Sequence, residues 1–206
     1  MNQEIKYSSL AIAAALLTGS AHAGALTVTT YTSKASFNSA AGATVTDMLD
    51  DAAEQVAFGL LDRGDYTIDP VGGPWEPMLS IEDPSDPSNV NGTRFLEFGI
   101  LGATPGNDGR FIFDAPITAF GFDYNNIDTT DELLLAIDGQ IFTAAGTSSS
   151  GFFGITTDGG FTEVRLVSPD FKDFEYAGID NITYTPEPTS LALLGLGGLL
   201  VARRRR

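Results

Sequence analysis

LLLAI-DG-QIFTAA, residues 133–145, is the stretch that decides the fold class of this 206-residue chain. Two short apolar runs flank Asp138 and Gly139, a pair that suits the positive backbone dihedrals of a type I′ turn. The stretch therefore predicts an antiparallel β-hairpin. Apolar runs of similar length, rich in Phe, Ile, Val and Thr, continue through residues 110–184. Such runs, separated by turn signals, are typical of an all-β domain.

The remaining segments extend this prediction to about 8 to 10 antiparallel strands around one core. Strand patterns occur at 26–31, 43–49, 78–81 and 94–101, and within 110–184 separate strands are expected on either side of turns at 148–151 and 158–160. One short helix is predicted at 33–42, with Ser33 as its N-cap and Gly42 as its end. The five-proline stretch 69–92 predicts a long loop. The predicted architecture is a jelly-roll-like antiparallel β-sandwich.

The N-terminal 23 residues have the pattern of a secretory signal peptide. Lys6 gives a basic start, residues 10–17 form an apolar core, and Ala21-His22-Ala23 is a cleavage site of small residues. We therefore expect passage through the Sec translocon and removal of residues 1–23 by signal peptidase.

The C-terminal segment 185–206 reads TPEPTSLALLGLGGLLVARRRR. Its apolar run at 191–202 is shorter than the roughly 20 residues of an ordinary membrane helix. The arginines that follow do not cross a bilayer cheaply, so they hold this end in the cytoplasm. Pro186 and Pro188 separate the run from the domain, because proline stops a helix from extending. The segment therefore predicts a short transmembrane helix that serves as a cleavable retention signal.

Three features of this segment, in this order, resemble the PEP-CTERM sorting signal: a Pro-Glu-Pro motif, a short Gly/Leu-rich apolar run and a terminal arginine cluster. The residues that carry the resemblance are Pro186, Glu187, Pro188, Arg203, Arg204, Arg205 and Arg206. The resemblance implies recognition by an exosortase in the inner membrane of a Gram-negative bacterium. It implies release to the cell surface or to the extracellular polysaccharide of a biofilm. It also implies three parts: a signal peptide (1–23), a β-sandwich passenger domain (24–184) and the sorting signal (185–206).

Charge and composition exclude several classes of function. The formal net charge is −16, and five of the 11 basic residues lie in the two terminal signals, namely Lys6 and Arg203–Arg206. Such an acidic domain repels nucleic acid and anionic lipid. Cysteine is absent, and the single histidine, His22, leaves with the signal peptide. A Ser-His-Asp triad, a cysteine nucleophile and a His-ligated zinc site are therefore excluded, and we expect no enzyme activity and no resident cofactor.

Calcium is the one cation that the sequence suggests. It prefers six to eight oxygen ligands, often from loops. Asp123, Asp128 and Asp131 lie close together in FDYNNIDTTDE, and Asp180 stands in a second oxygen-rich segment, GIDNITY. The spacing does not match an EF-hand loop, and a solvated acidic turn is the alternative.

Three functions remain after these exclusions. The first is a non-catalytic surface or matrix protein associated with exopolysaccharide. The second is a carbohydrate-binding module, for which Trp75, with Tyr66 nearby, would supply an aromatic surface for a sugar ring; a Trp that plugs its own loop is the alternative. The third is a secreted glycosidase, which needs two facing carboxylates. The named candidates are Glu97 and Glu163, both in predicted strands, and solvated, outward-facing side chains are the alternative for both.

Overall fold

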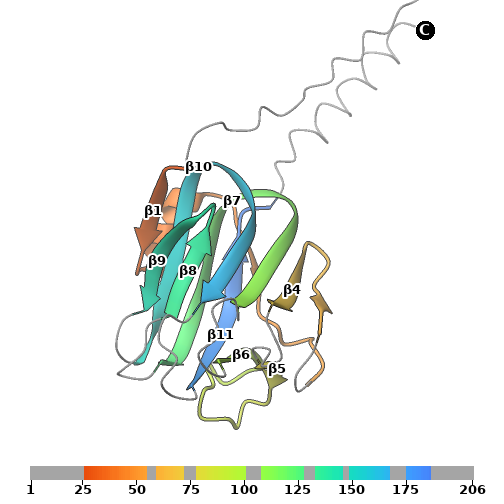
Figure 1. The fold of residues 1–206 in the computed structure, drawn as a ribbon. Coiled ribbons are helices and arrows are strands. Elements are labelled where there is room, and N and C mark those ends of the chain that lie inside the picture. Colours follow the sequence, from red (N-terminus) through yellow and green to blue (C-terminus); the bar gives the residue numbers. More distant parts are fainter. Residues whose placement is uncertain are drawn as a thin grey trace, which may run out of the picture.

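The computed structural model describes residues 26–54, 59–71, 78–100, 108–127, 133–145, 149–167 and 175–186. Within these ranges, one curled sheet of eleven strands forms the body of the domain, every pairing is antiparallel, and one short helix packs on its outside (Figure 1). The predicted class, mostly antiparallel β with one short helix, is confirmed. No helix in these ranges is long and apolar enough to cross a membrane.

In chain order the elements are β1 (Val28–Tyr31), α1 (Lys34–Ala41), β2 (Val45–Asp47), β3 (Leu61–Asp62), β4 (Tyr66–Val71), β5 (Met78–Glu82), β6 (Phe95–Ile100), β7 (Asp108–Ile127), β8 (Leu133–Ile137), β9 (Gln140–Ala145), β10 (Ser149–Val167) and β11 (Glu175–Tyr184). Hydrogen-bonded neighbours follow the order β5-β6-β11-β7-β10-β8-β9, with β1 on β10, β2 on β11, β4 on β7 and β3 on β4.

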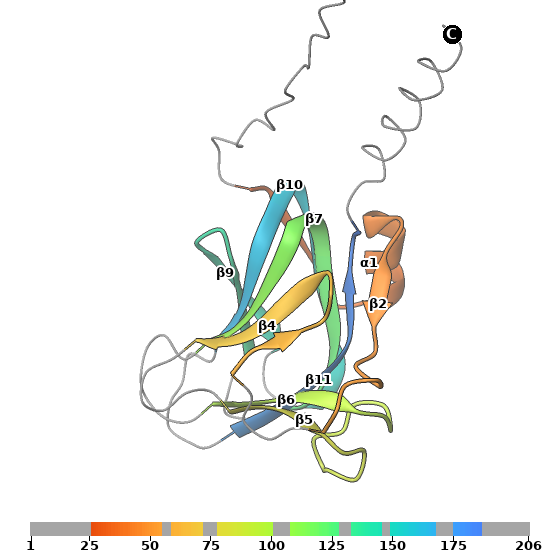
Figure 2. The same ribbon diagram turned by 90° about the vertical axis from the view of Figure 1, so that its right-hand side faces the viewer.

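Two long bent strands, β7 and β10, take part in both halves of the curled sheet. The first half of β7 pairs with β4 and with the second half of β10, as in the pairing of Phe111 with Val164. Its second half pairs with the first half of β10, as in Phe120 with Ile155, and with β11. Figure 2 shows the two halves from the side, with β4 in one half, β11 and β2 in the other, and α1 outside the second half.

The turns predicted at 148–151 and 158–160 are wrong for residues 149–151 and 158–160, which lie within β10; Ser148 lies outside the described residues. The register shifts between Thr156 and Phe161, so extra residues bulge out at the corner while pairing resumes beyond it. A bulge bends a strand without ending it. For the same reason β7 continues as one strand past Pro116.

The corner also changes which residues face the core. In the first half of β7 the buried rings are Phe111 and Phe113, whereas beyond the corner they are Phe120 and Phe122. Side chains alternate along a strand, so only an irregularity can switch the inward set from odd to even positions. The bend folds the strand back on itself, and the ring centroids of Phe111 and Phe120 lie 5.2 Å apart. The main core therefore lies between two halves of the same strands.

Gly160 shows how tightly the two corners pack. A Cβ atom at this position would lie 2.7 Å from the Cβ of Pro116 on β7. Glycine at 160 therefore lets the corner of β10 approach the corner of β7, which a larger residue would prevent.

The helix and the central hairpin form as the sequence predicts. The Ser33 side chain accepts a hydrogen bond from the N–H of Ser36 at 3.5 Å, and Gly42 ends the helix at a φ of 78°. Phe37 is fully buried against Ala119 and Phe152, which form a small second core on the outer side of the sheet. In the hairpin turn, Asp138 and Gly139 have φ values of 48° and 74°, as a type I′ turn requires.

The long loop predicted at 69–92 is wrong in part. β4 runs to Val71 with Pro70 inside it, so residues 69–71 are strand and not loop, whereas β5 (Met78–Glu82) is the short strand predicted at 78–81. Residues 83–93 do form a loop, which is held by side-chain turns. In these turns the Asp83 and Asp86 carboxylates accept hydrogen bonds from the N–H groups of Ser85 and Ser88, at 2.9 and 2.7 Å.

Candidate functional site

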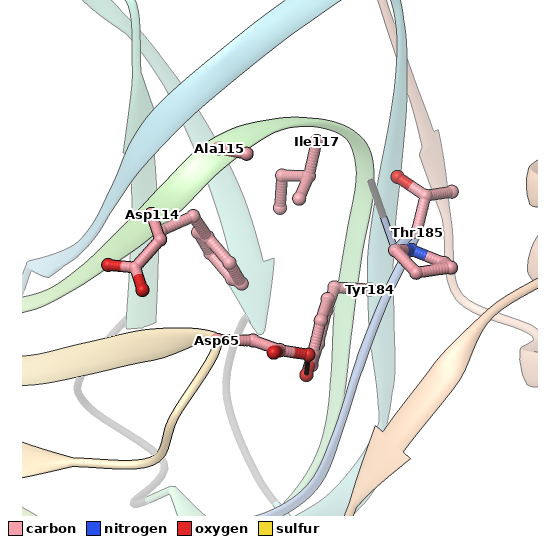
Figure 3. Close-up of a pocket in the computed structure, with 8 residues that line it drawn as sticks. Asp65, Asp114, Ala115, Ile117, Tyr184 and Thr185 are labelled. Carbon is pink, nitrogen blue, oxygen red and sulfur yellow. Dashed lines mark hydrogen bonds between the residues drawn. The ribbon is translucent and has the colours of Figure 1, made fainter. Parts of the chain in front are cut away.

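A pocket of about 390 Å³ opens at the corner of β7, where three distant parts of the chain meet. The corner itself supplies Phe113, Asp114, Ala115 and Ile117, the turn between β3 and β4 supplies Asp65, and the end of β11 supplies Tyr184, Thr185 and Pro186. Figure 3 shows these side chains around the hollow. The pocket therefore lies at the junction between the β domain and the C-terminal segment.

Hydrogen bonds fix the walls of this corner pocket. The Tyr184 hydroxyl donates to Oδ2 of Asp65 at 2.8 Å, and the backbone N–H of Asp114 donates to the carbonyl of Asp65 at 3.1 Å. The Thr185 hydroxyl oxygen accepts hydrogen bonds from the N–H groups of Thr118 at 2.8 Å and Ala119 at 3.2 Å. The end of β11 is thus clasped to the corner of β7.

The lining combines an aromatic floor with an acidic mouth. Phe113 and Tyr184 are almost fully buried, and their ring centroids lie 5.2 Å apart. Burial, followed by the hydrogen bond to Asp65, raises the pKa of Tyr184, so its hydroxyl stays protonated and remains a donor. Asp65 and Asp114 are exposed, and none of the described lining residues is basic.

The predicted calcium ligands are only partly described. Asp128 and Asp131 lie outside the described residues, whereas Asp123 and Asp180 are directly opposite each other on β7 and β11. Asp123 is already engaged, because its Oδ2 accepts from Lys34 Nζ at 2.6 Å and from Asn181 Nδ2 at 2.9 Å. Within the described ranges, no three His, Cys, Asp or Glu side chains gather as a metal site would require.

Asp180 is unusual because it is fully buried in β11. Burial raises its pKa to about 7, against a lowering by the hydrogen bond from the backbone N–H of Asn181 at 2.6 Å. The nearby acids Asp50 and Asp123 raise the pKa further. Asp180 is therefore a buried carboxyl surrounded by other acids, and a cation there stays a prediction.

The two candidate catalytic acids of the glycosidase hypothesis do not face each other. Glu97 lies between two core residues of β6, Leu96 and Phe98, so its side chain projects from the outer face of that half of the sheet. Glu163 precedes the core residue Val164 in β10, in the other half, and likewise projects outward. Both glutamates therefore face outward, as the alternative interpretation has it, and they do not form the close pair of carboxyl groups that a glycosidase holds across one site.

Glu163 also has a structural role on its outer face. Its Oε1 accepts from Arg165 Nε at 2.6 Å, and its Oε2 lies 3.6 Å from a terminal nitrogen of Arg110. Arg110 also pairs with Asp69 on β4. These contacts tie together three neighbouring strands.

The aromatic and sorting residues are described only in part. Trp75 lies outside the described residues, and so do Glu187, Pro188 and Arg203–Arg206. Tyr66 is 1% exposed and packs in the main core, so the expectation that it joins an exposed sugar-stacking surface is wrong. Pro186 is described and lines the corner pocket. Asp65, Asp114 and Tyr184 were not predicted as site residues. The one local signal is Asp114, an acidic residue two positions before Pro116 within a strand pattern.

Comparison with protein families finds a match at the C-terminal end of the chain. Residues 185–206 match the model of the PEP-CTERM protein-sorting motif. No curated protein sequence matches the chain.

Two solved structures are similar to the domain. One is a family 11 carbohydrate-binding module from Clostridium thermocellum in complex with a β-1,3-1,4-mixed-linked tetrasaccharide; it is 11% identical with a TM-score of 0.40, over 64% of this chain and 95% of that one. The other is the family 11 module of a cellulosomal cellulase of the same organism, 12% identical with a TM-score of 0.34, over 70% and 96%. The chain thus ends in a match to the PEP-CTERM protein-sorting motif, which follows a domain built on one curled antiparallel β-sheet.

Proposed function

We propose that this chain is a non-catalytic protein of the cell surface or extracellular matrix of a Gram-negative bacterium. Signal peptidase removes residues 1–23, the motif at 185–206 holds the chain briefly in the inner membrane, and an exosortase releases it. The released domain then associates with extracellular polysaccharide. The sorting motif is the observation that carries this proposal.

The junction between domain and motif supports release as a folded unit. Thr185 is 8% exposed and is clasped to Thr118 and Ala119, so the fold extends to the first residue of the matched motif. A cut beyond Pro186 would leave these contacts intact.

We also propose a jelly-roll connectivity for the domain, a framework that stays stable without disulfides at this size.

Intact-mass measurement of the protein secreted by its native host tests the processing. We expect a species that begins near Gly24 and ends close to Pro186–Pro188. A variant in which all four terminal arginines are replaced by alanine should accumulate in the membrane fraction or fail to be trimmed. Recovery of a soluble wild-type species that still carries Arg203–Arg206 would refute the proposal.

Carbohydrate binding is the second candidate, and the corner pocket favours it. Aromatic rings beside carboxylate acceptors are the groups that a sugar ring, with its apolar face and its hydroxyl donors, requires. A glycosidase is less well supported, because Glu97 and Glu163 project from opposite outer faces. Release of reducing sugar from the native polysaccharide by the purified protein would establish turnover and refute the non-catalytic proposal.

A further inference from the structure

We propose that the corner pocket, lined by Asp65, Phe113, Asp114, Ile117 and Tyr184 among others, binds an amine-bearing sugar residue. This inference rests on the proposed association with polysaccharide and names the class of saccharide that the pocket takes. It depends on three properties of the pocket: its unbalanced charge, its aromatic floor and its size.

The charge of the pocket is unbalanced within the described chain. Asp65 and Asp114 stand at its mouth, and no described lining residue is basic. Asp65 accepts one hydrogen bond, from Tyr184, whereas among the described residues the Asp114 carboxylate accepts none. Lys34, Arg63 and Arg110 form their ion pairs with acidic residues outside the pocket. Within the described chain, no basic side chain of the lining neutralises these two carboxylates, so the pocket suits a cationic group.

The floor selects for a ring rather than for a bare cation. Phe113, Ile117 and Tyr184 reach the pocket with small edges of otherwise buried side chains, and the half-buried Ala115 and Pro186 complete its apolar surface. The C–H face of a sugar ring packs on such a surface, while its substituents point to the polar rim. A free metal ion would gain nothing from the three apolar side chains. An ammonium group on a sugar ring meets both the floor and the carboxylates.

The size and rigidity of the pocket limit the ligand to one residue. A volume of about 390 Å³ is at the small end of the usual range of 300–1,000 Å³ for ligand sites. The hydrogen bond between Tyr184 and Asp65 and the clasp of Thr185 hold the walls in place. Preformed walls reduce the entropy that binding costs. The pocket therefore fits the terminal residue or a branch of a chain.

Charge also sets the expected discrimination among saccharides. A uronic acid, a sulfate or a phosphate would be repelled by two carboxylates on a chain of net charge −16. An N-acetylated amino sugar has no positive charge, and a neutral hexose has none either. Both would lose the charge-assisted hydrogen bonds that an ammonium group makes.

The test uses the protein as secreted by its host, at about 0.15 M salt to screen distant charges. Calorimetry measures the binding of three tetrasaccharides of equal length: β-1,4-linked glucosamine, its N-acetylated form and its neutral glucose counterpart. We expect the glucosamine tetramer to bind best. Asp114→Asn should weaken its affinity by about 10- to 100-fold, the effect of losing one charge-assisted hydrogen bond. Ala115→Trp, which fills the pocket without changing its charge, should abolish binding.

Asp138→Asn is the matched control. It removes the same charge from an exposed residue outside the pocket, and Asn suits the positive φ of that turn. Equal loss of affinity in Asp114→Asn and Asp138→Asn would show non-specific attraction and overturn the proposal. Equal binding of the three tetramers, or no binding of any, would also overturn it. Wild-type retention on native exopolysaccharide that persists in Ala115→Trp would overturn this pocket while leaving the proposed matrix association standing.

Discussion

The buried carboxyl of Glu97 makes the stability of this domain depend on pH. Glu97 lies in β6, is 8% exposed, and sits with Ser88 of the 83–93 loop. Burial, followed by repulsion from Asp86 and Glu82, raises its pKa to about 7, from 4.5 for a solvated glutamate. Between pH 4.5 and pH 7 the folded chain therefore keeps a proton that the unfolded chain releases.

The sign of the effect follows from this difference in bound protons. Stability falls as pH rises wherever the folded state binds more protons, so the free energy of unfolding should fall from pH 4.5 to pH 7 and then level off. The two pKa values correspond to a loss of about 3 kcal/mol from Glu97. Glu97→Gln has the same shape and no charge. It should therefore match the wild type near pH 4.5 and exceed it by about 1–3 kcal/mol at pH 8.

Urea unfolding at half-unit steps from pH 4.5 to pH 8 measures this difference. Asp180 adds its own pH dependence to both proteins, so the comparison isolates Glu97. Glu54→Gln, at an exposed residue outside the sheet, is the matched control and should follow the wild type throughout. Parallel profiles for wild type and Glu97→Gln would refute the reasoning, because they would show that Glu97 titrates alike in the folded and unfolded chains.

Three further predictions concern packing, the clasp and calcium. Gly178→Ala would place a Cβ 1.9 Å from the carbonyl oxygen of Ser88, so it should lower the free energy of unfolding in urea by about 1–3 kcal/mol. Gly59→Ala is the control, because its new Cβ would have no atom within 4 Å and should leave the stability unchanged. Equal effects of the two substitutions would contradict the packing argument. Thr185→Val leaves the N–H groups of Thr118 and Ala119 without their acceptor and should lower the free energy of unfolding by about 1–3 kcal/mol. Hydrogen exchange at these two amides should become faster. Unchanged exchange would show that Thr185 does not hold β11 to the corner of β7. Millimolar calcium should raise the melting temperature more than magnesium does at equal ionic strength, because a hundredfold excess over Kd stabilises the folded state by about 2.7 kcal/mol. Asp180→Ala should abolish the difference between the two ions. Equal shifts for the two ions in the wild type would exclude the site.

The features that the sequence predicts correctly are those with a local cause. The hairpin at Asp138 and Gly139 follows from a two-residue turn, and the helix follows from its Ser33 cap and its glycine end. The corners of β7 and β10 escape prediction because Pro116 and Gly160 have the appearance of strand breaks. In the fold these positions lie at bulges. Each strand continues beyond its bulge because partner strands distant in the sequence pair with it there.

The corner pocket is hidden from the sequence for a similar reason. Asp65 and Tyr184 share a hydrogen bond across 119 positions, and no pattern within either segment indicates the other. The glutamates could be placed in strands from alternation alone, but the faces on which they lie depend on which neighbours reach the core. Each of Glu97 and Glu163 is the strand neighbour of a core residue, so its side chain points away from the core. The two glutamates therefore lie on the outer faces of opposite halves of the sheet.

The place of β11 in the sheet has a consequence for how the chain acquires its structure during secretion. It is the last strand of the domain in sequence, yet it lies inside the sheet, with β7 on one side and both β6 and β2 on the other. Its Thr183 pairs with Thr46, near the beginning of the domain. Such long-range closures slow folding, and until β11 arrives three strands expose unpaired edges that invite aggregation. If the chain leaves the cytoplasm with its N-terminus first, as proposed, it completes its fold only after its final strand has emerged. The proposed retention of the next segment in the membrane would keep unfinished molecules apart until that last strand is in place.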